Sequence, residues 1–160
     1  MDFTQFKGII FDLDGTLVDS SHVWSDIDEK FMAKRSIELP GDYFKKVSSM
    51  NFNQAAVYTI ERFGLDETVD SVTKEWYEMA QEEYASNVFI KPGADEFLRY
   101  IKSQGIKIAL ATASAEPLYS SALKNNGVYE LFDSFASTDR VKRGKGFPDV
   151  YQLACDEISL

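Results

Sequence analysis

The chain has 160 residues, a length that fits one compact domain or one domain with an insertion. Its 26 acidic and 17 basic residues give a formal charge of −9, which argues against binding of nucleic acid through phosphate contacts. A hydrophobic content of 44% excludes wholesale disorder, and a single cysteine excludes an internal disulfide framework. The sequence contains neither a membrane-length apolar run nor a signal peptide, so we expect a cytoplasmic protein without a membrane partner.

The N-terminal half of the chain begins with a strand pattern and continues with helical patterns. The short apolar run at residues 8–13, GIIFDL, predicts a strand that is buried on both faces. Residues 20–86 then show helical periodicity that no strand interrupts. We expect a small helical bundle there, with Trp76 and Tyr84 in its core.

Strands and helices alternate in the remaining part of the chain. Strands are predicted at residues 107–111 and 135–137, each followed by a helical segment. This alternation is typical of a parallel α/β sheet. The helical bundle is then an insertion after the carboxyl end of the first strand, which is where ligands bind in open α/β sheets. We therefore expect the bundle to act as a lid over a site.

Two carboxylates follow the first predicted strand. Asp12 and Asp14 are two residues apart and point to the same side if the extended conformation continues. Two carboxylates this close repel each other unless a cation lies between them, and Mg²⁺ is a suitable partner for such oxygens. One carboxylate can attack phosphorus, and the other can exchange a proton with the leaving oxygen. The alternative is a strand that simply ends in polar turn residues.

The segment FDLDGTLVDS, residues 11–20, resembles the first motif of the haloacid dehalogenase-like (HAD) hydrolases. The helical insertion after it resembles the branch that contains β-phosphoglucomutase and phosphoglycolate phosphatase. This resemblance implies an α/β fold with a Rossmann-like parallel sheet. It implies a core domain of residues 1–17 and 89–160, and a helical cap of residues 18–88.

The same resemblance implies a Mg²⁺-dependent phosphatase that hydrolyses a small phosphorylated metabolite. Asp12 would be the nucleophile and would carry an aspartyl-phosphate, and Asp14 would be the general acid and base. The metal would be held by Asp12 and Asp14. Gly15 and Thr16 would contribute to phosphate binding through the turn that follows the two carboxylates.

The second and third family motifs have matches further along the chain. The segment ALATAS places Thr112 at the end of the next core strand, where its hydroxyl would bind a phosphate oxygen together with Ala113 and Ser114. Alternatively, Thr112 only caps a turn. Lys145 precedes a helix that begins with a proline, and it would neutralise the nucleophile and the phosphoryl group. In the alternative, Lys145 belongs to a solvated basic loop. Because Lys142 lies close by, the sequence leaves open which of the two lysines matches the motif.

Specificity in this branch is attributed to the cap. The first cap helix would present His22 and Trp24 to the substrate. His22 could shuttle a proton, because histidine titrates near neutral pH, but a lone helical histidine is more often a surface or packing residue. Trp24 is a packing aromatic in the alternative reading.

The fourth family motif, an acidic pair at the end of a fourth strand, has no match after Lys145. We therefore interpret the sequence as a C-terminally truncated member whose sheet lacks its later strands. If the family strand order holds, one edge of the first strand loses its partners, and unpaired strand edges invite association. The sequence thus predicts that this edge is covered, either by a second copy through self-association or by another segment.

Three functions remain open at this point. The leading one is the phosphatase, and the second is a sugar-phosphate mutase, which would keep the phosphate on the sugar. The third is an inactive fragment that lacks the metal ligand of the fourth motif. Turnover that depends on Asp12 would exclude the third.

Overall fold

The computed structural model describes residues 3, 5–47, 50 and 52–160. The chain divides into two compact units. The first unit combines Met1–Ser21 with Glu83–Leu160, and the second consists of His22–Glu82. The predicted α/β class, with a parallel sheet and an additional set of helices, is confirmed.

The first unit is built on a three-stranded parallel sheet in the order β1-β4-β5. These strands are β1 (Gly8–Phe11), β4 (Lys107–Thr112) and β5 (Ser134–Ser137). The central strand β4 is buried along all but its first residue, because it has neighbours on both edges and helices on both faces. Both β1 and β5 pair with β4 in parallel, so the carboxyl ends of all three strands meet at one edge of the sheet.

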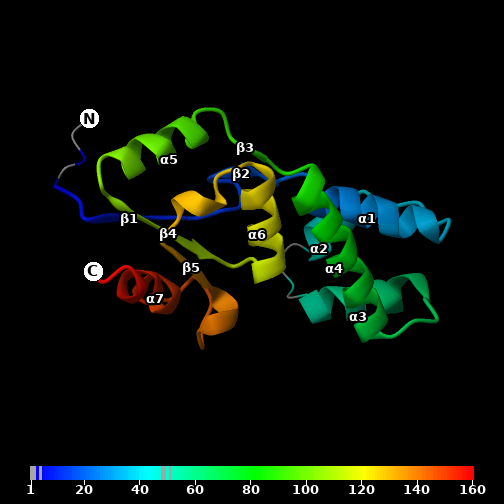
Figure 1. Cartoon of the computed structure of the whole chain (residues 1–160). Helices are drawn as coiled ribbons and strands as arrows, with labels where there is room; N and C mark the ends of the chain where they lie inside the picture. Colours follow the sequence, from blue (N-terminus) through cyan, green and yellow to red (C-terminus); the bar gives the residue numbers. More distant parts are fainter. Residues whose placement is uncertain (1–2, 4, 48–49, 51) are drawn as a thin grey trace. The chain divides into compact units, whose positions relative to one another are not determined.

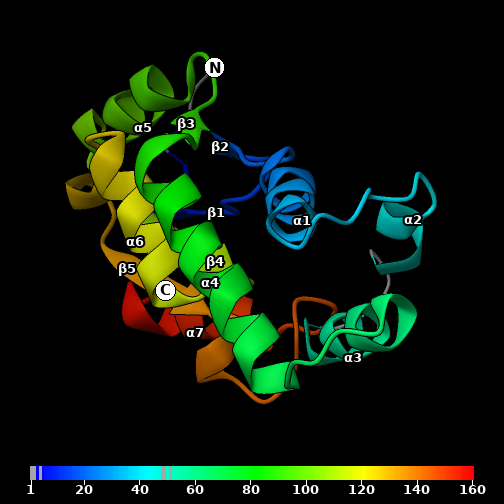
Figure 2. The same ribbon diagram turned by 90° about the vertical axis from the view of Figure 1, so that its right-hand side faces the viewer.

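Three helices cover this sheet: α5 (Ala94–Ser103), α6 (Glu116–Asn125) and α7 (Asp149–Glu157). Figures 1 and 2 show α5 and α7 on opposite sides of the sheet. The α7 face is lined by small strand residues, which allow the helix to pack closely. Two 3-10 turns, η1 (Tyr129–Leu131) and η2 (Thr138–Arg140), flank β5.

A second, antiparallel sheet consists of two very short strands, β2 (Val18–Asp19) and β3 (Phe89–Ile90). The sequence patterns did not predict it, because two residues are too few to show a periodicity of two. This sheet joins the chain before the helical insertion to the chain after it.

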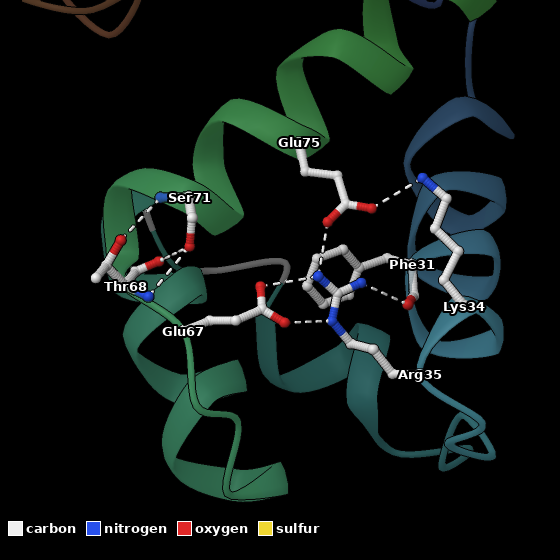
Figure 3. Close-up of polar contacts among 7 residues, drawn as sticks. All are labelled: Phe31, Lys34, Arg35, Glu67, Thr68, Ser71 and Glu75. Carbon is white, nitrogen blue, oxygen red and sulfur yellow. Dashed lines mark hydrogen bonds and ion pairs between the residues drawn. The ribbon is translucent and has the colours of Figure 1, made fainter.

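The second unit contains α1 (Val23–Lys34), α2 (Tyr43–Val47), α3 (Phe52–Phe63) and the greater part of α4 (Val69–Ser86). Its helices match the helical patterns of the sequence. The guanidinium of Arg35 connects α1 to the segment before α4 and to α4 itself (Figure 3). It donates to both carboxylate oxygens of Glu67, at 2.7 and 2.8 Å, and to a carboxylate oxygen of Glu75 at 2.6 Å. The same guanidinium lies over the Phe31 ring, 3.5 Å from the ring centre.

The start of α4 is closed by a reciprocal cap. The Ser71 N–H donates to the Thr68 hydroxyl and the Thr68 N–H donates to the Ser71 hydroxyl, each at 3.1 Å (Figure 3). These bonds satisfy an amide that has no partner within the helix.

No helix within the described ranges combines the length and the apolar character that crossing a bilayer requires.

Candidate active site

Asp12 directly follows β1 and forms an ion pair with Lys145. The Lys145 ammonium donates to Asp12 Oδ1, although 133 positions separate the two residues in sequence. The other carboxylate oxygen, Oδ2, has a long contact of 3.4 Å from the Thr16 hydroxyl. The side chain of Asp12 is 38% exposed, so a carboxylate paired with a cation remains accessible from solvent.

Asp14 is held by three hydroxyl groups. Its Oδ1 accepts from Tyr84 at 2.6 Å and from Ser20 at 2.8 Å, and its Oδ2 accepts from Ser114 at 2.5 Å. These donors come from the end of α4, from the segment after β2 and from the turn after β4. The three bonds fix the orientation of the carboxyl group.

Tyr84 is the residue of this site that the sequence patterns assigned wrongly. It is buried, as expected, but it belongs to the first unit and its hydroxyl serves Asp14, so it is not a core residue of the second unit. Burial and the neighbouring charge of Asp14 raise the pKa of the Tyr84 hydroxyl well above its usual range, so it remains a donor. No local signal marks such a tyrosine, because 70 positions separate it from Asp14.

The turn after Asp14 is closed by its own backbone. Gly15 has a φ of +72°, a conformation that glycine adopts without strain, and its N–H donates to the Val18 carbonyl at 3.0 Å. The Thr16 N–H donates to the Leu13 carbonyl at 3.1 Å. Both N–H groups therefore bond within the turn. Lys91 donates to the Gly15 carbonyl at 2.5 Å, a contact that the sequence did not reveal.

The end of β4 contributes Thr112, Ala113 and Ser114. Thr112 is fully buried, and its hydroxyl oxygen accepts the Ser114 N–H at 3.0 Å, which is the turn-capping role that the sequence left open. Ser114 therefore links Thr112 to Asp14. The carbonyl of exposed Ala113 accepts from Thr138 at 3.4 Å.

His22 and Trp24 belong to the second unit. His22 occupies the N-cap position of α1 without a capping bond from its side chain, and its carbonyl accepts from Ser25 at 2.7 Å. The Trp24 ring packs edge-on against Phe52, with 5.6 Å between the ring centres. Their roles toward a substrate stay predictions.

The Asp12 carboxylate and the Asp14 backbone carbonyl are oxygens of the type that Mg²⁺ binds. Among the described residues, no group of three or more His, Cys, Asp and Glu side chains could enclose a metal. Mg²⁺ does not need such a cage, since it retains several waters and binds through one or two carboxylates together with substrate phosphates. The Asp12 carboxylate and the Asp14 backbone carbonyl are the hard oxygens on offer.

A model of the haloacid dehalogenase-like hydrolase family matches residues 6–160. The chain belongs to this family. The matched range includes the strand before Asp12, the turn after β4 and Lys145.

Individual relatives of this HAD chain share fewer than a third of its residues. It is 28% identical over 151 residues to the bifunctional riboflavin kinase/FMN phosphatase of Arabidopsis thaliana, covering 94% of the chain but 40% of that relative. It is 29% identical over 160 residues to hexitol phosphatase A of Escherichia coli, covering 96% and 69%.

The fold of this HAD chain also resembles solved structures. A Thermotoga maritima protein assigned as a β-phosphoglucomutase superposes with a TM-score of 0.86 at 22% identity, covering 97% of this chain and 72% of that one. At this identity the likeness establishes the fold alone.

Proposed function

We propose that the protein is a phosphatase that hydrolyses small phosphorylated metabolites through an aspartyl-phosphate. The observation that carries the proposal is the Asp12–Lys145 pair at the carboxyl edge of a HAD-type sheet, with Asp14 two residues further on. Relatives named as phosphatases support the reaction class.

The proposed chemistry has two steps. In the first, an Asp12 carboxylate oxygen bonds to phosphorus while the bond from phosphorus to the ester oxygen breaks, and protonated Asp14 gives its proton to the departing oxygen. In the second, Asp14 takes a proton from a water molecule whose oxygen bonds to the phosphorus of the aspartyl-phosphate. Inorganic phosphate leaves, and both aspartates return to their starting forms.

The neighbouring residues orient these groups. Lys145 offsets the negative charge that builds up when a phosphoryl group approaches Asp12. Tyr84, Ser20 and Ser114 hold the Asp14 carboxyl in place. Through Ser114, the Thr112 hydroxyl supports the geometry of the turn after β4.

We also propose Mg²⁺ as the cofactor, held by the Asp12 carboxylate and the Asp14 carbonyl. When bound, it would supply positive charge to the phosphoryl oxygens and reduce the repulsion between them and Asp12.

The division of labour between the units is part of the proposal. We assign the chemistry to a core domain of residues 1–17 and 89–160, and substrate selection to a cap of residues 18–88, including His22 and Trp24; Ser20 and Tyr84, at the two ends of the cap range, orient Asp14. We also assign to the phosphate site Thr16, through its hydroxyl beside Asp12, and Ala113, while Gly15 shapes the turn that carries Thr16. The helical insertion after β1 supports this division.

The decisive experiment measures phosphate release from p-nitrophenyl phosphate with Mg²⁺. We expect turnover by the unaltered chain and a loss of roughly 10³-fold or more in Asp12→Asn. Asp139→Asn, which alters an exposed aspartate in η2, is the control. Equal turnover by Asp12→Asn and the unaltered chain would refute the proposal, and phosphate retained on a sugar phosphate would instead support the mutase.

We further propose that two copies of the chain associate through β1. Within the described residues, β1 pairs with β4 along one edge, and its other edge has no strand beside it. Such an edge favours strand addition. Light scattering after size-exclusion chromatography is expected to show a dimer, and a monomer at all concentrations would refute this proposal.

A further inference from the structure

The second unit contains a cavity of about 340 Å³ between α1, α2, α3 and α4. Its volume lies within the range typical of small-molecule sites. Trp24, Phe52 and Trp76 form much of its wall, and Asp28 and Tyr43 also line it. All five residues belong to the second unit.

The aromatic wall is continuous. Phe52 lies between the two tryptophans, with 5.6 Å from its ring centre to that of Trp24 and 5.5 Å to that of Trp76. Trp24 is 38% exposed and Phe52 is 37% exposed, so large apolar surfaces remain open to a ligand. A flat ring system gains the most from such surfaces, because it can contact the rings without losing internal freedom.

Two residues that line the cavity, Trp76 and Asp28, carry polar groups in a largely apolar setting. The indole nitrogen of Trp76 is buried, and no hydrogen-bond acceptor reaches it among the described residues. A buried donor of this kind is uncommon, since most find a partner. Asp28 is half-buried among apolar groups, and this burial raises the pKa of its carboxyl to about 7.

The remaining polar group of the wall, the Tyr43 hydroxyl, is already engaged. It lies 2.6 Å from the Thr59 hydroxyl, which in turn donates to the Ala55 carbonyl at 2.7 Å. Tyr43 therefore donates to Thr59 and does not serve Asp28. Among the described side chains of the wall, the Asp28 carboxylate is an acceptor and the Trp76 N–H is a donor without a partner.

We propose that this cavity binds a flat nitrogen heterocycle, such as a nucleobase, that donates an N–H to Asp28 and accepts the N–H of Trp76. A polyol lacks the planar body that the aromatic wall fits. The heterocycle can be the organic group of the substrate, which rests on the phosphatase proposed above, or a separate small molecule, which does not.

Tryptophan fluorescence reports directly on this cavity, because both tryptophans of the chain line it. The full chain is titrated with adenosine, uridine and, as a non-planar control, ribitol. We expect a saturable change with at least one nucleoside and none with ribitol. Absence of a saturable change with both nucleosides, or an equal change with ribitol, overturns the proposal.

Matched variants test the two polar contacts. Asp28→Asn, which replaces a charged acceptor by a weaker neutral one, and Trp76→Phe, which removes the donor, are each expected to raise the Kd about tenfold. Glu29→Gln, an exposed neighbour of Asp28 in α1, is expected to leave the Kd unchanged. Thermal melting establishes that each variant is folded. If Trp76→Phe does not fold, Asp28→Asn decides, and an unchanged Kd in it overturns the proposal.

Kinetics separates the two sources of the heterocycle. If the cavity holds part of the substrate, Asp28→Asn raises KM for adenosine or uridine monophosphate and leaves turnover of acetyl phosphate, which has no ring, unchanged. If the ligand is a separate molecule, the variant weakens nucleoside binding while KM for the monophosphates stays the same. Nucleoside binding without turnover of any phosphate ester would refute the phosphatase and leave the cavity site standing.

Discussion

The two units treat a partly buried carboxylate in opposite ways. In the first unit, Asp14 receives hydrogen bonds from Tyr84, Ser20 and Ser114. In the second, Asp28 lies in an aromatic cavity where burial raises its pKa to about 7. The two carboxyl groups differ in their surroundings: hydroxyl donors surround Asp14, whereas the cavity around Asp28 is lined mainly by apolar side chains. The first arrangement suits fixed orientation, and the second suits a ligand that supplies the missing bond.

The largest expected effect concerns the charge pair of the first unit. Lys145→Ala removes the cation beside Asp12 and is expected to lower kcat for acetyl phosphate by roughly 10²–10³-fold, because the charge of the transferring group is no longer offset. Lys142→Ala, an exposed lysine of the same loop, is the matched control. Steady-state kinetics on both variants checks this, and an equal loss in the two would assign the effect to the general charge of the loop.

A smaller effect is expected when one of the hydroxyls around Asp14 is removed. Tyr84→Phe retains the ring and loses one donor, so kcat is expected to fall about tenfold while KM for acetyl phosphate stays the same. Tyr100→Phe, on the exposed side of α5, is expected to change neither value. A change confined to KM would show that Tyr84 acts on substrate binding and not on Asp14.

Asp28 is expected to make the second unit less stable as pH rises, whereas a carboxylate with a lowered pKa makes a protein more stable as pH rises. Its folded pKa of about 7 exceeds the ordinary value of 3.8, so stability falls as pH rises between these values. The free energy of unfolding of Asp28→Asn, taken relative to that of the unaltered chain, is expected to rise by about 1–2 kcal/mol from about pH 5 to about pH 8, after allowance for partial exposure. Urea unfolding at both pH values measures this difference, and a gap that does not change with pH contradicts it.

The smallest effect concerns the cap of α4. Thr68→Ala removes the hydroxyl that accepts the Ser71 N–H, and about 1 kcal/mol of stability is expected to be lost. Thr68→Ser retains the oxygen and is expected to recover most of it. Urea unfolding provides the comparison, and equal loss in both variants would point to packing of the threonine methyl.

Local patterns predicted most of the secondary structure. The apolar runs of β1 and β4 and the helical spacing of α1 depend on neighbouring residues, so they can be read within a few turns or pleats. The short strands β2 and β3 were not predicted, because two residues are too few to show a periodicity. The position of Asp28 in a cavity was not predicted either, because in the sequence an acidic residue on an amphipathic helix looks like a solvated surface residue.

By itself, the sequence determined the strand that precedes Asp12, the alternation that makes a parallel sheet, and the resemblance to the family. Only the tertiary structure decided which side chains meet. Asp14 contacts Ser114 across 100 positions and Tyr84 across 70, and Trp76 forms one wall of a cavity with Trp24. Periodicity describes the face of one element, whereas such contacts depend on how separate elements pack, and that is set by the sum of many weak interactions along the whole chain.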